Sequence, residues 1–114
     1  MAVSVVDASA LSAVVFGEPD ADRVVEQLAG KALVAPSLLV YELGNTCWKK
    51  CRRHPQSATS IRKAFASLSR FDIELMAVLE LAEEQGVTFY DAAYLWLADR
   101  LQVRLVTLDR RLMR

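Results

Sequence analysis

Short apolar segments alternate along the chain with longer stretches in which apolar residues recur at helical spacing. Three mainly apolar segments, 2–6, 32–35 and 103–108, are typical of buried strands. A fourth, 71–75, is either a short strand or the start of the next helix. Strands that alternate with helices predict a parallel sheet with right-handed crossovers. We therefore expect an α/β fold whose ligand site lies beyond the carboxyl ends of the strands.

Residues typical of helix termini mark the expected helices. Gly17 and Pro19 close the first helix, Gly30 follows the second, and Ser37 is the expected N-cap of the longest. The helix 91–100 is apolar nearly all round, which predicts that it is covered on most sides. The expected helices span residues 9–16, 20–28, 36–52, 60–69, a stretch ending near 85, and 91–100.

Length and composition narrow the class of protein. A chain of 114 residues with 54% apolar content is expected to form one domain, residues 1–114, around one core. It has 14 basic and 14 acidic residues, so a nucleic-acid contact would need a local basic patch. Neither a signal peptide nor a long apolar stretch is visible, and we expect a cytoplasmic protein with no membrane partner.

Two smaller groups of residues allow alternative interpretations. Cys47, Cys51 and His54 have a spacing that a thiolate and imidazole metal site could use, but a fourth ligand is missing. Two packed thiols and a surface imidazole, in a reducing compartment, are the favoured interpretation. Tyr41 and Trp48 share one side of the same expected helix, where they either pack normally or contribute to an oligomer interface.

Four acidic residues lie at joints between the expected elements. Asp7 and Asp109 each follow a strand, and Asp91 opens the helix 91–100. Glu42 lies beside the apolar stripe of the longest helix. Taken singly, three of them could belong to helix caps and Glu42 could be an exposed helix residue. In an α/β fold, however, these joints can meet at one edge of the sheet.

A cluster of carboxylates needs a compensating positive charge, because each carboxylate raises the pKa of its neighbours. Only Asp109 has basic neighbours in the sequence, so a bound cation is the expected compensation. Oxygen ligands favour Mg²⁺ or Mn²⁺, and the single histidine argues against zinc. Such an ion can lower the pKa of bound water and neutralise charge on a phosphate, which predicts a nuclease.

Four sequence blocks carry a resemblance to a known family. They are VVDASAL at 5–11, PSLLVYELGN at 36–45, TFYDAAYLWLA at 88–98 and LVTLDRRL at 105–112. In this order they resemble the signature blocks of PIN-domain ribonucleases, especially the VapC-type toxins of toxin–antitoxin pairs. The resemblance runs nearly from end to end of the chain.

This resemblance implies a three-layer α/β/α fold with a central parallel sheet of four, possibly five, strands. It implies that Mg²⁺ or Mn²⁺ is bound by a catalytic quartet, Asp7, Glu42, Asp91 and Asp109. Polar groups that orient the acids are implied at Ser9, Asn45 and Thr107. It also implies endonucleolytic cleavage of RNA, homodimers or higher oligomers, and inhibition by a small cognate antitoxin.

Two positions depart from the family pattern. The sequence ends five residues after Asp109, where relatives usually continue into an edge strand, so we expect Asp109 to be held less firmly. Gln102 stands where relatives often carry a turn glycine. A PIN-like domain without catalysis, acting as a binding partner or oligomeric scaffold, therefore stays open as an alternative.

Basic residues near the helix ends are the candidate RNA contacts. They are Lys49, Lys50, Arg52, Arg53 and Arg110, with Arg111 and Arg114 close in sequence. The alternative is that they only complement helix dipoles in solvent.

Two other acidic architectures fit less well. A phosphoacceptor signalling domain would need an acidic pair after an early strand and a lysine closing a late one, and neither is present. The haloacid-dehalogenase pattern would need a second aspartate where Ser9 stands.

Overall fold

A parallel sheet of four strands forms the centre of the described structure. The computed structural model describes residues 2–76 and 89–113, and for 89–92 it describes the backbone alone. The strands are β1 Val3–Val6, β2 Ala32–Pro36, β3 Ile73–Met76 and β4 Leu105–Val106. Their order is β3-β2-β1-β4, and each neighbouring pair is parallel. The predicted α/β fold is confirmed, and the segment 71–75 leads into a strand.

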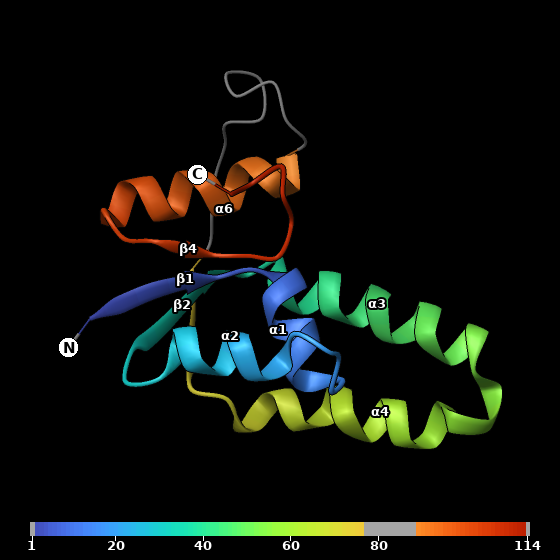
Figure 1. Ribbon diagram of the computed structural model, residues 1–114. Helices are drawn as coiled ribbons and strands as arrows, with labels where there is room; N and C mark the ends of the chain where they lie inside the picture. The colour runs from blue at the N-terminus through green and yellow to red at the C-terminus, as the bar shows by residue number, and fades with distance from the viewer. Residues whose placement is uncertain (1, 77–88, 114) are drawn as a thin grey trace.

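Helices cover both faces of this sheet (Figure 1). They are α1 Ala8–Val15, α2 Ala21–Leu28, α3 Leu39–Arg53, α4 Ala58–Ala66 and α6 Phe89–Leu101, with 3-10 turns η1 Pro55–Ser57 and η2 Ser67–Arg70. Helix α6 lies on one face, where it contacts β1, β2 and β4, while α1 and α2 lie on the opposite face. Helices α3 and α4 pack against each other and extend beyond the sheet. The three layers α/β/α follow from this arrangement.

Strand β1 lies inside the sheet, between β2 and β4, and this determines where the candidate site lies. Val5 and Val6 of β1 are fully buried and share one core cluster with Leu11 of α1, Leu43 of α3 and Leu97 of α6. Burial on both faces explains why this strand is apolar at every position except the buried Ser4, rather than alternating. The residue that follows β1 therefore lies at the centre of the carboxyl edge of the sheet, with helices on both sides.

One expected helix start is wrong. Pro36 was predicted to open the long helix with Ser37 as its N-cap, but Pro36 is the last residue of β2 and pairs with Met76 of β3. The backbone N–H of Ser37 continues this pairing by donating to the carbonyl of Met76 at 2.9 Å, and α3 begins at Leu39. Proline is tolerated at the end of a strand because the ladder needs no further donor from it.

The turn after α6 shows how Gln102 replaces the glycine that relatives often carry at this position. Gln102 adopts φ 53°, the left-handed conformation that usually selects glycine after a helix. Its side-chain amide donates to the carbonyl of Asp99 at 2.7 Å and so holds this turn. The helix expected to end near residue 85, with Gly86 and Thr88, lies outside the described residues. None of the helices in the described part of the chain is long and apolar enough to cross a bilayer.

Candidate functional site

Asp7 lies at the end of β1 and is the N-cap of α1. Its backbone N–H donates to the carbonyl of Val106 in β4, and its Oδ1 accepts from the N–H of Ala10 at 3.0 Å. Only 3% of the residue is exposed. The capping role considered from the sequence is therefore confirmed, and the same position buries a carboxylate at the sheet edge.

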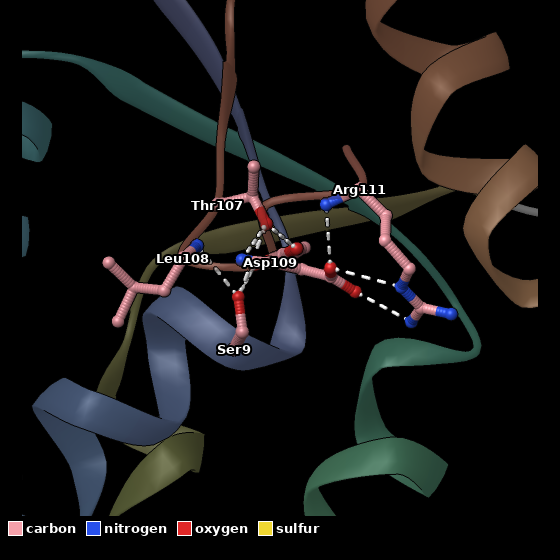
Figure 2. A network of polar contacts seen from close by, with 6 residues as sticks. Ser9, Thr107, Leu108, Asp109 and Arg111 are labelled. Carbon is pink, nitrogen blue, oxygen red and sulfur yellow. Dashed lines mark hydrogen bonds and ion pairs between the residues drawn. The ribbon is translucent and has the colours of Figure 1, made fainter. Parts of the chain in front are cut away.

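Two hydroxyl groups, those of Ser9 and Thr107 (labelled in Figure 2), also bond the Asp7 carboxylate. Ser9 Oγ donates to Asp7 Oδ1 at 2.7 Å, and Thr107 Oγ1 donates to Oδ2. Each hydroxyl in turn accepts a backbone N–H: Leu108 donates to Ser9 at 2.8 Å, and Asp109 donates to Thr107 at 2.9 Å. Because an ionised carboxylate can only accept hydrogen bonds, both O–H groups point toward Asp7. The segment after β4 is thus tied directly to the carboxylate after β1.

The protonation state of Asp7 reflects a conflict between burial and hydrogen bonding. Burial raises the pKa of Asp7 above its ordinary value, and the negative charge of Asp109 raises it further. The hydrogen bonds from Thr107, Ala10 and Ser9 act in the opposite direction and lower it. A carboxylate has about four acceptor positions, and the three donors leave about one of them. A small cation at that position would satisfy the remaining lone pair and offset the repulsion from Asp109.

Glu42 enters the site from α3 and is held by α6. The hydroxyl of Tyr94 donates to Glu42 Oε1 at 2.5 Å, although the two residues lie 52 positions apart. Burial is the main reason that the pKa of Tyr94 is raised, and the charges of Glu42 and Asp7 add to it. Tyr94 therefore stays a neutral donor at physiological pH and fixes one carboxylate oxygen. Ser9, which bonds Asp7, lines the same cavity as Glu42, and this places the two acids at one site.

A cavity of about 450 Å³ opens beside these acids. Its lining comes from α1, the turn after it, α3 and the segment after β4, namely Ala8, Ser9, Ser12, Glu18, Glu42, Asn45, Thr46 and Leu108. Ser9, Glu42 and Asn45, all singled out from the sequence, share this cavity, and Asn45 is exposed on α3. Asp7 lies beneath the cavity wall, bonded to Ser9.

Glu18 is a second carboxylate at this cavity that the sequence interpretation missed. It accepts from Ser12 Oγ at 3.3 Å and forms an ion pair with Lys50 at 2.8 Å. Lys50 also lies over the ring of Phe16, 5.3 Å from its centre. In the sequence Glu18 is visible only as an acidic residue in the turn between Gly17 and Pro19. Nothing in that turn shows that α3 packs against it.

Asp109 differs from the other acids because an arginine engages both of its oxygens. Arg111 Nε donates to Oδ1 at 3.2 Å, and Nη2 donates to Oδ2 at 2.8 Å. The backbone N–H of Arg111 also donates to Oδ1, at 3.0 Å. These bonds lower the pKa of Asp109. That Asp109 is held less firmly than in relatives stays a prediction, and in this structure Arg111 bonds both of its carboxylate oxygens.

Asp91 is placed only by its backbone, in the first turn of α6. Its side chain lies outside the described residues. Helix α6 also carries Tyr94, which bonds Glu42, so the start of this helix belongs to the same end of the sheet.

The basic candidates divide into two groups. Four of them, Lys49, Lys50, Arg52 and Arg53, lie in the last turns of α3. Within this group Lys50 is committed to Glu18, and the guanidinium of Arg52 lies 4.9 Å from the centre of the Trp48 ring. Arg110 is exposed next to Asp109, and Arg114 lies outside the described residues. Lys50, which pairs with Glu18, and Arg111, which pairs with Asp109, thus contact acids directly, and Arg110 lies between Asp109 and Arg111 in the sequence.

The donor set suits a hard divalent cation. Its groups are carboxylate oxygens, and the buried Asp7 has both an unfilled acceptor position and a raised pKa that a cation would lower. Among the side chains that the structure describes, which exclude Asp91, no three His, Cys, Asp or Glu residues form a ready metal cluster. The thiols of Cys47 and Cys51 instead face carbonyls of Ile61 and Ala58, as expected for packed thiols, and His54 is exposed.

Comparisons with known proteins agree with this geometry. The PIN domain family model matches residues 4–114. Ribonuclease VapC3 of Pyrobaculum aerophilum is 33% identical over 120 residues, covering 95% of this chain and 90% of the relative. Exonuclease VapC9 of the same organism is 41% identical over 81 residues, covering 67% and 61%. The crystal structure of PAE2754 from Pyrobaculum aerophilum matches with a TM-score of 0.74 and 32% identity, covering 97% of this chain and 77% of that one. This chain belongs to the PIN domain family and is homologous to the VapC ribonucleases.

Proposed function

We propose that this protein, as a single PIN domain, is a Mg²⁺- or Mn²⁺-dependent endoribonuclease and the toxin of a toxin–antitoxin pair. The observation that carries the proposal is the buried carboxylate of Asp7, held by three donors at the centre of the sheet edge. A side chain so desolvated and so well oriented is a functional-site feature, because a purely structural cap needs neither the burial nor the second acid nearby.

The residues divide into ligands and groups that orient them. Asp7, Glu42, Asp91 and Asp109 would hold the cation, which when bound supplies a more acidic water and neutralises charge on the scissile phosphate. Three hydroxyls orient these ligands, since Ser9 and Thr107 hold Asp7 and Tyr94 holds Glu42. Asn45, which lines the same cavity as Glu42, is proposed as a further polar group that orients the acids.

RNA would reach the acids through the open cavity. Its walls carry the carboxylates of Glu18 and Glu42, which repel phosphates unless positive charge lies nearby. Lys50 at one rim and Arg110 beside Asp109 are the proposed phosphate contacts, and Lys49, Arg52 and Arg53 would extend them along α3. Contacts of this kind bind phosphate without reading sequence.

The proposed protein partners are a cognate antitoxin and a second copy of the chain. The antitoxin is proposed from the homology to Ribonuclease VapC3. On α3, Tyr41 is 79% and Trp48 is 54% exposed, so neither is packed inside this chain. Exposed aromatic side chains on one helix favour the oligomer interface over ordinary packing.

A cleavage assay with two forms of one RNA tests the proposal. Linear and covalently closed circular RNA of the same sequence are incubated with the protein and Mg²⁺, with EDTA as the metal-free reference. We expect both forms to be cut, with Asp7→Asn and Asp91→Asn reducing the rate by at least about a hundredfold. Asp22→Asn, an exposed acid on α2, is the matched control and should cut normally.

Each other outcome has a defined meaning. Cleavage of the linear RNA alone would replace the endonuclease by an exonuclease, the activity in the name of the relative VapC9. Equal cleavage by Asp7→Asn and the wild type would show that the acidic site is not the catalyst.

A second candidate function is a PIN-like binding partner without catalysis. The feature that favours it is the Asp109–Arg111 ion pair, because an arginine already neutralises one of the four acids. A protein of this kind would cut neither RNA form and would not bind Mn²⁺ at millimolar concentrations.

A further inference from the structure

Arg111 makes a close and directional contact with Asp109 (Figure 2). Nε and Nη2 approach different carboxylate oxygens, at 3.2 and 2.8 Å, so the pair is bidentate. In this arrangement the guanidinium faces the two oxygen atoms that a metal ion would use. Asp109 also interacts electrostatically with Asp7, which ties the pair to the rest of the site.

We propose that Arg111 acts as a built-in counter-ion that competes with the divalent cation for Asp109 and thereby sets the affinity of the site. The inference rests on the proposed metal-dependent function and adds a positioning residue to it. The guanidinium occupies Asp109 when no ion is bound, and it withdraws from at least one oxygen when the ion binds.

The surroundings of the pair permit this exchange. The side chain of Arg111 is 70% exposed, so most of its surface already contacts water. The side chain of Asp109 is 25% exposed, and the backbone that carries it is held by the bond from its N–H to Thr107. The backbone N–H of Arg111 still donates to Asp109 Oδ1 after the guanidinium has left. The carboxylate thus keeps its orientation when the charge beside it is removed.

The sign of the effect follows from electrostatics. A guanidinium 2.8 Å from a carboxylate oxygen repels a divalent ion that binds the same carboxylate. Solvent screens this exposed pair, so the effect on affinity is moderate. Removing the charge of Arg111 should therefore tighten ion binding about three- to tenfold.

Neighbouring Arg110 provides a matched control. It is exposed, carries the same charge one residue away, and within the described residues makes no ion pair. Arg111→Gln and Arg110→Gln change the net charge equally, so a general field effect would act on both. A specific competition for Asp109 would act on Arg111→Gln alone.

Calorimetric titration with Mn²⁺, without RNA and at low ionic strength, tests the inference on the whole chain. We expect the Kd for Mn²⁺ to be about three- to tenfold lower in Arg111→Gln than in the wild type, and to change less than about twofold in Arg110→Gln. In an Asp109→Asn background, Arg111→Gln should lower the Kd for Mn²⁺ less than it does in the wild type. Thermal melting of each variant confirms that it is folded.

The outcomes separate this inference from the proposed function. If the wild type binds Mn²⁺ and Asp7→Asn does not, but Arg111→Gln matches Arg110→Gln or binds more weakly, the counter-ion role is wrong and the metal site stands. If the wild type and Asp7→Asn bind Mn²⁺ equally, or neither binds it, the metal site itself is wrong and the counter-ion role falls with it.

Discussion

Replacing Thr107 by valine removes the hydroxyl that donates to Asp7 while keeping the side-chain volume. Thr107 and Asp7 are both buried, so water cannot replace the lost donor. A hydrogen bond to a charged group contributes about 1.5–3 kcal/mol, and the N–H of Asp109 loses its acceptor as well. We expect the free energy of unfolding to fall by about 2–3 kcal/mol near pH 7.5. For a chain of this length the melting temperature should fall by about 8–12 °C.

The cost of Thr107→Val should also depend on pH. Burial holds the pKa of Asp7 above its ordinary value, and the Thr107 hydroxyl lowers it by stabilising the ionised form. The contribution of this hydrogen bond is therefore present where Asp7 is ionised and fades as pH falls through the raised pKa. The ionisation of the Asp7 carboxylate itself changes the free energy of unfolding in the opposite direction. Because its folded pKa lies above the unfolded value, the cation-free wild type loses stability as pH rises through that pKa.

Chemical denaturation between about pH 8 and pH 5 measures both quantities, provided that divalent ions are removed. Thr59→Val, the same chemical change at an exposed position of α4, is the control and should cost less than about 0.5 kcal/mol. The reasoning is refuted if Thr107→Val costs no more than Thr59→Val, or if its cost grows as the pH falls.

Substitutions at three further positions test the phenol contact, the Glu18–Lys50 ion pair and the turn after α6. Tyr94→Phe should lower the free energy of unfolding by about 1–2 kcal/mol and weaken Mn²⁺ binding several-fold in titration, whereas Tyr41→Phe at an exposed site should do neither. Glu18→Gln should cost less than about 1 kcal/mol by thermal melting, because its ion pair with Lys50 is about a third exposed. Glu18→Gln should also raise the affinity for RNA in a filter-binding assay, because Lys50 becomes available to phosphate. Unchanged affinity would argue against Lys50 as a phosphate contact. Gln102→Gly should raise the free energy of unfolding by about 0.5 kcal/mol and Gln102→Val lower it by about 1 kcal/mol, because φ is positive there; the reverse order would contradict the turn geometry.

The parts of the fold that could be predicted from the sequence are those with a local cause. The apolar run of β1, the acid after it and the short helix α1 follow one another directly, and strand burial and N-capping act over a few residues. The alternation of strands and helices then predicts a parallel sheet. The family resemblance of the four blocks also predicted which segments far apart in the sequence meet at the site. One of them carries Thr107, which bonds Asp7 across 100 positions.

The features that were missed depend on pairings between distant segments. Pro36 and Ser37 have the local character of a helix start, but β3 extends the strand and its pairing overrides that preference. Glu18 belongs to the cavity only because the turn after α1 packs beside Lys50 of α3. Tyr94 lies in a helix that is apolar nearly all round, where its pattern indicates core packing and conceals the bond to Glu42.

The most direct test of the central claim is the anomalous diffraction of crystals soaked in Mn²⁺. We expect one strong peak at the carboxyl edge of the sheet, with oxygen atoms of Asp7 and at least one of Glu42, Asp91 and Asp109 at about 2.0–2.3 Å from the ion. A saturated soak that leaves this edge without a peak, or that places the ion away from Asp7, would contradict it.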